Sequence, residues 1–136
     1  MDDCLFCKIG NGVIPSHKIL ETPEVMAFLD INPVNAGHCL IIPKTHSDDF
    51  FKAERGDLIA LLDATTLLAP KIKEAVQAQG INIAINNGKA AGQIIFHTHI
   101  HIIPRFESDG FRHWSGKKKF TESDFATLAE KIRSNF

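Results

Sequence analysis

The sequence predicts one globular domain in which antiparallel strands are combined with helices. The chain has 136 residues, of which 44% are hydrophobic, enough for a single core and few for two. Two stretches alternate with the period of two that is typical of strands, and three other short apolar runs also suggest strands. One longer stretch repeats its apolar residues every three or four positions, as an amphipathic helix does. We therefore expect a single domain over residues 1–136.

The first third of the chain contains three predicted strands. Short apolar runs at 18–20 and 25–30 are separated by polar residues and Pro23, a pattern that is typical of a hairpin. The third run, 38–42, is followed by Pro43, which closes it. Its apolar character is unbroken, so we expect both faces of this strand to be buried.

A long helix is predicted between residues 57 and 79, where apolar side chains recur at spacings of three and four. Pro70 lies inside this segment. It should bend the helix, because its ring removes one N–H group and crowds the preceding turn. Gly80 is expected to end the helix, since glycine tolerates the left-handed conformation found at helix ends.

Two further strands are predicted on either side of a glycine-containing loop. Residues 81–86 alternate with a period of two, and so do residues 96–103. The loop 87–93 joins them directly, so we expect the two strands to pair antiparallel. This loop lacks the Lys-Ser/Thr pair of a Walker motif. It is either a plain hairpin connection or a loop whose amides and Gln93 face an anion.

The sequence alone does not predict a structure for residues 106–120, which are rich in glycine, serine and charged residues. Thr121 and Asp124 then resemble a capping box, with Asp in place of the usual Glu or Gln. The apolar residues that follow mark one face of a terminal helix, namely Phe125, Leu128, Ala129 and Ile132.

Charge and hydropathy exclude two classes of partner. The formal net charge is −1, whereas nucleic-acid binding usually shows as a basic surplus. No apolar run approaches the roughly 18 residues that would span a bilayer. The acidic start at Asp2 and Asp3 is also unlike the basic start of a signal peptide. We expect a cytoplasmic protein with no nucleic-acid or membrane partner.

Cys4 and Cys7 are separated by the two-residue gap that lets two thiolates bind one metal ion. The chain has three cysteines, which without an export signal indicate thiols or metal ligands rather than disulfides. A zinc site would need two further ligands, and histidines are abundant downstream. Two alternatives stay open, namely an unligated pair and a redox motif, which would need a strand and a longer helix around it.

Three of the seven histidines alternate with other residues in the stretch 96–103. In an extended chain His97, His99 and His101 lie on one face, with neighbouring rings about 6.6 to 6.8 Å apart. Such rings can surround a phosphoryl group or share a metal site, and the alternative is a solvated strand face. Crowding disfavours protonation, so His99, between two neighbours, should stay neutral and nucleophilic. Its attack on phosphorus would give a nucleotidyl-imidazole that water cleaves.

This stretch resembles the motif of the histidine triad (HIT) family, His-x-His-x-His followed by two hydrophobic residues. The Gly92-Gln93 pair and the segments 28–31 and 37–46 also look like those of the family, so the resemblance covers about residues 4–105. It implies an α+β fold with a five-stranded antiparallel sheet per subunit, one long kinked helix and a C-terminal helix. It further implies a homodimer of the small nucleotide-binding, phosphoramidase-like branch.

The resemblance also implies roles for individual residues. His99 corresponds to the nucleophile that takes the nucleotidyl group, with His101 and His38 beside the same centre. The phosphate and ribose would be held by Asp30, Asn86, Gln93, His97 and His101. The base would lie between apolar side chains that are otherwise ordinary core candidates, namely Leu5, Phe6, Ile9, Phe28 and Ile31.

Members with a Cys-x-x-Cys start, and the related galactose-1-phosphate uridylyltransferases, are similar to this chain in a second way. Their zinc is held at the positions of Cys4, Cys7, His46 and His97. Four N and S ligands form a closed site, which is structural rather than catalytic. Zinc would hold His97 fixed and neutral, so its metal and phosphate roles compete.

The expected function is hydrolysis of a purine nucleoside phosphoramidate, or a related P–N or P–O nucleotide conjugate. A nucleotidyl-histidine on His99 would form first, and water would then release a nucleoside monophosphate. Two alternatives are a dinucleoside polyphosphate hydrolase and a non-catalytic nucleotide-binding regulatory protein. The chain departs from many relatives at Ile94, where they have serine near the scissile bond.

Overall fold

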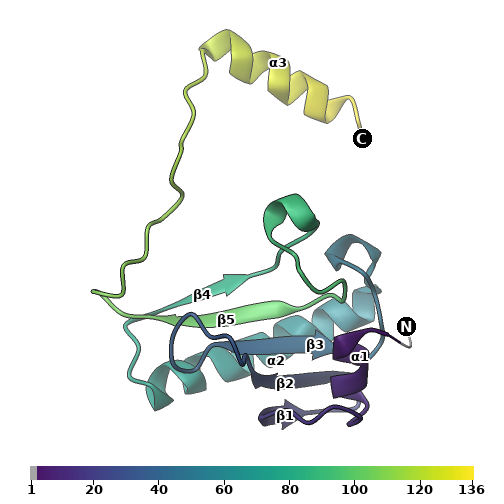
Figure 1. Cartoon of the computed structure of the whole chain (residues 1–136). Coiled ribbons are helices and arrows are strands. Elements are labelled where there is room, and N and C mark those ends of the chain that lie inside the picture. Colours follow the sequence, from purple (N-terminus) through teal and green to yellow (C-terminus); the bar gives the residue numbers. More distant parts are fainter. Residues whose placement is uncertain (1–2) are drawn as a thin grey trace.

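The structure, a computed structural model, describes residues 3–136. The acidic N-terminus, which is unlike the start of a signal peptide, includes Met1 and Asp2, and these two residues lie outside the described part of the chain. Five antiparallel strands form one sheet in the order β1-β2-β3-β5-β4 (Figure 1). This confirms the expected α+β fold with a five-stranded antiparallel sheet. The strands are β1 (Lys18–Glu21), β2 (Val25–Leu29), β3 (Cys39–Pro43), β4 (Gly80–Ala84) and β5 (Ile100–Arg105).

Within residues 3–136, three α-helices and two short 3-10 turns accompany the sheet. The long helix α2 packs across one face of the sheet, and the short helix α1 packs on the opposite face (Figure 1). In the described part of the chain, no helix is long and apolar enough to cross a membrane. The elements are α1 (Leu5–Gly10), η1 (Phe50–Lys52), α2 (Arg55–Ala75), η2 (Lys89–Ala91) and α3 (Glu122–Arg133).

The strand β3 lies in the middle of the sheet and all of its residues are buried, as its unbroken apolar sequence predicted. Successive side chains of a strand point to opposite faces. Ile41 therefore joins the core beneath α2, whereas Leu40 and Ile42 join the core beneath α1. The α1 core also contains Phe6 and Phe28. The sheet is thus covered on both sides, and the side chains of the candidate site gather on the α1 side.

The expected end of the long helix is wrong by several residues. The helix α2 contains Pro70, but it ends at Ala75 rather than near Gly80, which is the first residue of β4. The chain turns at Gln77, which adopts a positive φ of 56°. Gly80 pairs with Arg105 at the start of the β4–β5 ladder, so the helix must end before it. The spacing of apolar residues carries no signal of this pairing with a distant strand.

The histidine stretch is a strand over only part of its expected length. β4 and β5 pair antiparallel as predicted, but β5 begins at Ile100, so His101 is the only triad histidine within a strand. The preceding residues bond to a distant loop instead, because the Thr98 N–H donates to the Ser47 carbonyl at 2.8 Å. The rings of His99 and His101 are consequently 4.9 Å apart, closer than the expected strand spacing.

The C-terminal arm, defined here as residues 110–136, leaves the sheet after β5 and carries α3 away from it (Figure 1). Its first part has no regular structure. The predicted capping box is present, since the Asp124 N–H donates to the Thr121 side chain and the Thr121 N–H donates to the Asp124 carboxylate. The expected C-terminal helix is thus confirmed, although its apolar face is exposed.

Candidate functional site

A cavity of about 460 Å³ opens on the α1 side of the sheet. Its apolar wall includes all five side chains expected to hold a base, namely Leu5, Phe6, Ile9, Phe28 and Ile31. Its polar wall contains Asp30, His38, Asn86, His99 and His101. The rings of Phe6 and Phe28 meet edge to face at 5.7 Å, so the floor of the cavity is rigid and aromatic.

His99 is buried at the cavity with one ring nitrogen already bonded. Its Nδ1 lies 2.6 Å from the carbonyl oxygen of His97. A carbonyl only accepts, so Nδ1 carries the proton and the Nε2 lone pair is left free. Burial lowers the pKa of His99, and the hydrogen bond to the His97 carbonyl raises it by a smaller amount. The ring is therefore neutral at pH 7 and offers an unprotonated nitrogen, as a nucleophile must.

The position of His38 depends on the turn before β3. Gly37 has a positive φ of 87°, and a Cβ placed there would lie 3.0 Å from a methyl group of Val76. Only glycine fits this close approach to the end of α2. The turn directs the His38 ring, which is 4% exposed, into the polar wall of the cavity.

A chain of hydrogen bonds fixes the proton positions on two of the rings. The backbone N–H of Val34 donates to His38 Nδ1 at 3.0 Å, so the His38 proton is on Nε2. His38 Nε2 then donates to His101 Nδ1 at 2.9 Å, which leaves the His101 proton on its own Nε2. Burial, followed by the neighbouring His99 and His38, lowers the pKa of His101 to about 4. His101 is therefore a neutral hydrogen-bond donor at pH 7.

Ligand atoms of Asp30, His38 and His101 lie within 4.8 Å of one another, a grouping that resembles a carboxylate-histidine metal site. The Asp30 carboxylate lies 3.6 Å from His38 Nε2. A metal would need the lone pair of that nitrogen, yet the Val34 amide keeps the proton there. This cluster is accordingly a hydrogen-bond relay and not a metal centre.

Acidification is expected to destabilise the protein between about pH 6.5 and pH 4. Burial lowers the pKa values of His38 and His101 below that of an unfolded histidine, about 6.5, so the unfolded chain binds more protons in this range. Because the His101 ring is partly exposed, we expect its share to be about 1 to 2 kcal/mol. Urea unfolding at pH 7 and pH 4.5 measures the loss. His101→Gln should reduce this loss of unfolding free energy, whereas His113→Gln, a control at an exposed site, should leave it unchanged. Equal losses in the wild-type protein and both variants would contradict the role of His101.

Cys4, Cys7, His46 and His97 converge at one point beside the cavity. His97 Nδ1 lies 3.4 Å from Cys4 Sγ and 3.5 Å from Cys7 Sγ, and His46 Nδ1 lies 3.4 Å from Cys7 Sγ. A tetrahedral zinc with its usual bond lengths separates neighbouring S and N ligands by about 3.6 Å. The four side chains thus have the spacing of a closed metal site.

The outer nitrogens of the two histidines orient them for a metal. His97 Nε2 donates to the Pro43 carbonyl at 2.8 Å, and His46 Nε2 donates to Asp48 at 3.1 Å. Both rings therefore turn an unprotonated Nδ1 toward the thiols, as metal-binding histidines do. Burial, followed by the Cys4 thiol, raises the pKa of Cys7. A cation would offset this cost of ionising two adjacent thiols, so the donor set fits a metal ion.

Two residues expected at the phosphate lie elsewhere. His97 belongs to the group of four side chains that could hold a metal ion. Gln93 is 3% exposed and does not line the cavity. Its Nε2 donates to the carbonyls of Asp48 and Ile95, at 2.6 and 3.1 Å, and its Oε1 accepts from the Gly88 N–H at 2.8 Å. Gln93 thereby joins the loop after β4 to the loop that carries His46.

Sequence reasoning did not find the groups that orient the histidines. These are the Val34 amide, the Pro43 carbonyl and the Asp48 carboxylate. The backbone groups have no sequence signal, and Asp48 looks like any exposed acidic residue. Ile94, where many relatives have serine, lines the cavity and is 84% exposed.

Comparisons with known proteins agree on one family. The family model described as HIT domain matches residues 11–108. An uncharacterized HIT-like protein of Borreliella burgdorferi is 41% identical over 99% of both chains. Adenylylsulfatase HINT3 of Arabidopsis thaliana is 44% identical over 79% of this chain and 55% of that protein. Adenosine 5'-monophosphoramidase HNT1 of Candida albicans is 38% identical over 75% of this chain and 70% of that protein.

Solved structures share the fold over nearly the whole chain. SMU.412c from Streptococcus mutans is 39% identical and superposes with a TM-score of 0.92, covering 99% of this chain and 86% of that chain. A Zn-bound histidine triad family protein from Mycobacterium smegmatis is 33% identical with a TM-score of 0.77, covering 98% of both chains.

Proposed function

This chain belongs to the HIT domain family, and from that premise we propose that it hydrolyses a purine nucleoside phosphoramidate, or a related nucleotide conjugate, to a nucleoside monophosphate. One observation carries the proposal. His99 is buried and neutral at a cavity, and its Nδ1 proton is held by the His97 carbonyl, so that Nε2 is free to attack. A protein that only bound nucleotides would not need an unprotonated nitrogen at this place.

The proposed reaction has two displacements at phosphorus. His99 Nε2 attacks, the P–N bond breaks, the leaving nitrogen takes a proton from solvent and departs as the amine, and a nucleotidyl-histidine forms. Water then attacks the same phosphorus and gives up a proton to solvent, the bond to His99 breaks, and the nucleoside monophosphate leaves. His101 Nε2–H is the group suited to donate to a phosphoryl oxygen as its charge increases.

The remaining cavity residues suit a nucleoside. The aromatic floor of Phe6 and Phe28 offers flat apolar contact to a purine. At the mouth, Leu5 and Ile31 are 40% and 81% exposed, so a bound base would bury apolar surface there. Asp30 accepts from the Asn32 N–H with one carboxylate oxygen, and the second oxygen is available to ribose hydroxyls.

The leaving group is the point on which the alternatives differ. No lysine or arginine is among the residues that line the cavity in the described chain. A dinucleoside polyphosphate would bring several more negative charges, which the apolar Ile94 and Ile31 cannot pair. Two relatives are named adenylylsulfatase and adenosine 5'-monophosphoramidase, which supports an adenylyl conjugate with a small leaving group.

Zinc is the ion we propose for the group of two cysteines and two histidines. The donor set is the one zinc prefers, and the distances match its tetrahedral edges. A bound ion would supply a structural cross-link between α1, the loop after β3 and the triad. His97 then orients the site and does not reach the phosphate. We further propose a cytoplasmic homodimer.

The test is a substrate panel with the metal-loaded protein. Adenosine phosphoramidate, adenylyl sulfate and a dinucleoside polyphosphate are compared at equal concentration, and nucleoside monophosphate release is followed by chromatography. We expect the phosphoramidate or the sulfate to be cleaved at least about 10-fold faster than the polyphosphate. Release from none of the three, by protein that still binds AMP, would favour the non-catalytic regulator instead.

A further inference from the structure

The loop between β2 and β3, residues 30–37, carries the amide that fixes the proton positions of the histidine relay. The Val34 N–H donates to His38 Nδ1. The pairing of β3 with β5 places the rings of His38 and His101 side by side, with their centroids 5.2 Å apart. This pairing does not include the loop, and Val34 itself is 56% exposed. Another contact must therefore keep the Val34 amide in place.

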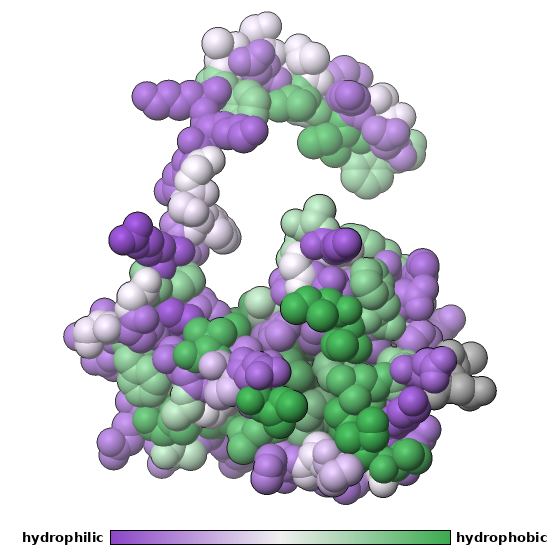
Figure 2. Space-filling model, in the orientation of Figure 1, coloured by the Kyte–Doolittle hydropathy of each residue, from purple (hydrophilic) through white to green (hydrophobic). Residues whose placement is uncertain are grey.

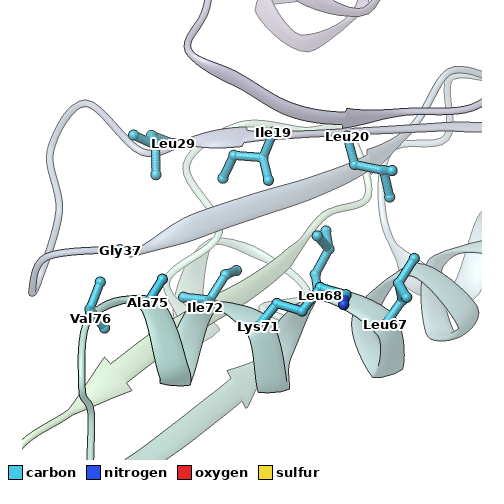
Figure 3. A pocket seen from close by; sticks show the side chains of 10 residues that line it. All are labelled: Ile19, Leu20, Leu29, Gly37, Leu67, Leu68, Lys71, Ile72, Ala75 and Val76. Atoms are coloured by element: carbon cyan, nitrogen blue, oxygen red, sulfur yellow. The ribbon is translucent and has the colours of Figure 1, made fainter.

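The two ends of this loop are held by the sheet and by packing, but its middle is not. Figure 3 shows Leu29 and Gly37 at the two ends, with Gly37 above Val76 at the end of α2. A Cβ on Gly37 would lie 3.0 Å from Val76, so this end approaches the helix closely. Between the two ends, residues 31–34 are exposed. Their position depends on hydrogen bonds to other parts of the chain.

Among the described residues, one side chain joins the middle of the loop to a distant segment. The Asn35 Nδ2 group donates to the Pro104 carbonyl at 2.8 Å and to the Asp109 carboxylate at 2.9 Å. Pro104 belongs to β5, the strand that also carries His101. Asn35 follows Val34 directly, so these two bonds hold the Val34 amide in a fixed position relative to β5.

The Asp109 carboxylate is itself held firmly. Its side chain is 8% exposed, and it accepts from Arg105 at 2.7 Å and from the N–H groups of Phe106 and Phe111 at 2.9 and 3.0 Å. Asp109 is the last residue before the C-terminal arm, which leaves the body as a narrow column of mostly hydrophilic residues (Figure 2). The anchor of Asn35 therefore belongs to the folded body and not to the arm.

We propose that Asn35 and Asp109 are positioning residues of the proposed reaction, acting through the Val34 amide. While this amide stays on His38 Nδ1, the His101 proton stays on Nε2 and can be donated to a phosphoryl oxygen. The reversed relay, with His101 Nδ1–H donating to His38 Nε2, would bring the His38 Nδ1–H against the Val34 N–H. Once the amide moves away, the reversed relay becomes accessible, and His101 Nε2 then has no proton to donate. The catalytic consequence rests on the proposed function, whereas the proton positions do not require turnover.

Nitrogen NMR of the imidazole rings at pH 7 tests the proton positions in the metal-loaded full chain, because protonated and unprotonated ring nitrogens resonate far apart. In the wild-type protein the rings of His38 and His101 should both carry the proton on Nε2. Asn35→Ala should make the reversed relay at least about 10-fold more populated, since it no longer meets a fixed donor. Asp109→Asn should do the same, because its amide offers one acceptor oxygen in place of two. Wild-type proton positions in both variants would overturn the proposal.

Turnover tests the positioning role. Asn35→Ala should lower kcat about 10-fold or more, because a small displacement away from the reacting atoms can cost up to about 100-fold. The affinity for AMP should fall much less, since Phe6 and Phe28 of the cavity come from α1 and β2. A wild-type kcat despite reversed rings would overturn the positioning role. Wild-type protein that cleaves nothing in the panel, but whose ring protons depend on Asn35, would refute the proposed function and support the hold of Asn35 on the relay.

Gln79→Ala is the matched control. Gln79 is exposed, and its Oε1 accepts from the Glu107 N–H at 2.6 Å, so this variant removes a side-chain amide bound to the turn that contains Asp109. It leaves the bonds of Asn35 in place and should keep wild-type ring protons and kcat. The double variant Asn35→Ala/Asp109→Asn should be no worse than the more damaged single variant, because both break the same contact. Equal changes in Gln79→Ala and Asn35→Ala would indicate a general loosening and would overturn the proposal.

Discussion

Replacing His99 with alanine is expected to lower turnover at least about 10³-fold while nucleotide binding persists. The alanine removes the ring whose Nδ1 bonds to the His97 carbonyl and whose Nε2 is left unprotonated at the cavity. The apolar wall of the cavity, including Phe6, is left in place. Turnover is measured by monophosphate release, and the affinity for AMP by calorimetry. Rapid acid quenching should trap a nucleotidyl adduct on the wild-type protein and none on His99→Ala.

The exposed His113 on the C-terminal arm provides the matched control. His113→Ala removes an imidazole outside the cavity and should leave both turnover and adduct formation unchanged. Near wild-type turnover by His99→Ala would mean that another group attacks phosphorus. Loss of AMP binding together with turnover would indicate a damaged cavity, and the adduct on wild-type protein would then have to be mapped directly.

Removal of one metal ligand is the second change with a large expected effect. Cys7→Ser should abolish zinc binding, because Cys7 Sγ contacts the Nδ1 atoms of both His46 and His97. Structural zinc contributes its binding free energy to folding, so the unfolding midpoint should fall by about 10 °C or more. Elemental analysis and scanning calorimetry measure the two effects. Wild-type protein that binds no zinc after reconstitution would contradict the proposed zinc site.

Cys39 is the matched control for the loss of a thiol. It is fully buried in the sheet, and burial raises its pKa to about 12, so it does not ionise or bind metal. Cys39→Ala should keep one zinc per chain despite a small loss of packing.

Because α1 carries Cys7 together with Phe6 and Ile9 of the cavity wall, Cys7→Ser should also weaken AMP binding. An unchanged affinity would show that α1 holds its place without the ion.

Much of the fold could be predicted because its signals are local. Short apolar runs predicted β1, β2 and β3, alternation predicted β4 and β5, spacings of three and four predicted α2, and the Thr121-Asp124 pair predicted the start of α3. The errors lie where distant segments compete with a local pattern. The Thr98 N–H donates to the Ser47 carbonyl, so Thr98 does not pair in the expected strand. The pairing of Gly80 with Arg105 makes the long helix end early.

The sequence by itself determined which chemistry the chain carries: a triad of imidazoles, a pair of thiols two residues apart, and the family to which both point. It could not decide what each ring does. A neutral imidazole is donor on one nitrogen and acceptor on the other, and the partner of one nitrogen fixes the role of its neighbour. Those partners come from far along the chain or from the backbone itself. The Pro43 carbonyl leaves the unprotonated Nδ1 of His97 facing the thiols, the His97 carbonyl leaves Nε2 of His99 unprotonated, and the Val34 amide, acting through His38, leaves the His101 proton on Nε2.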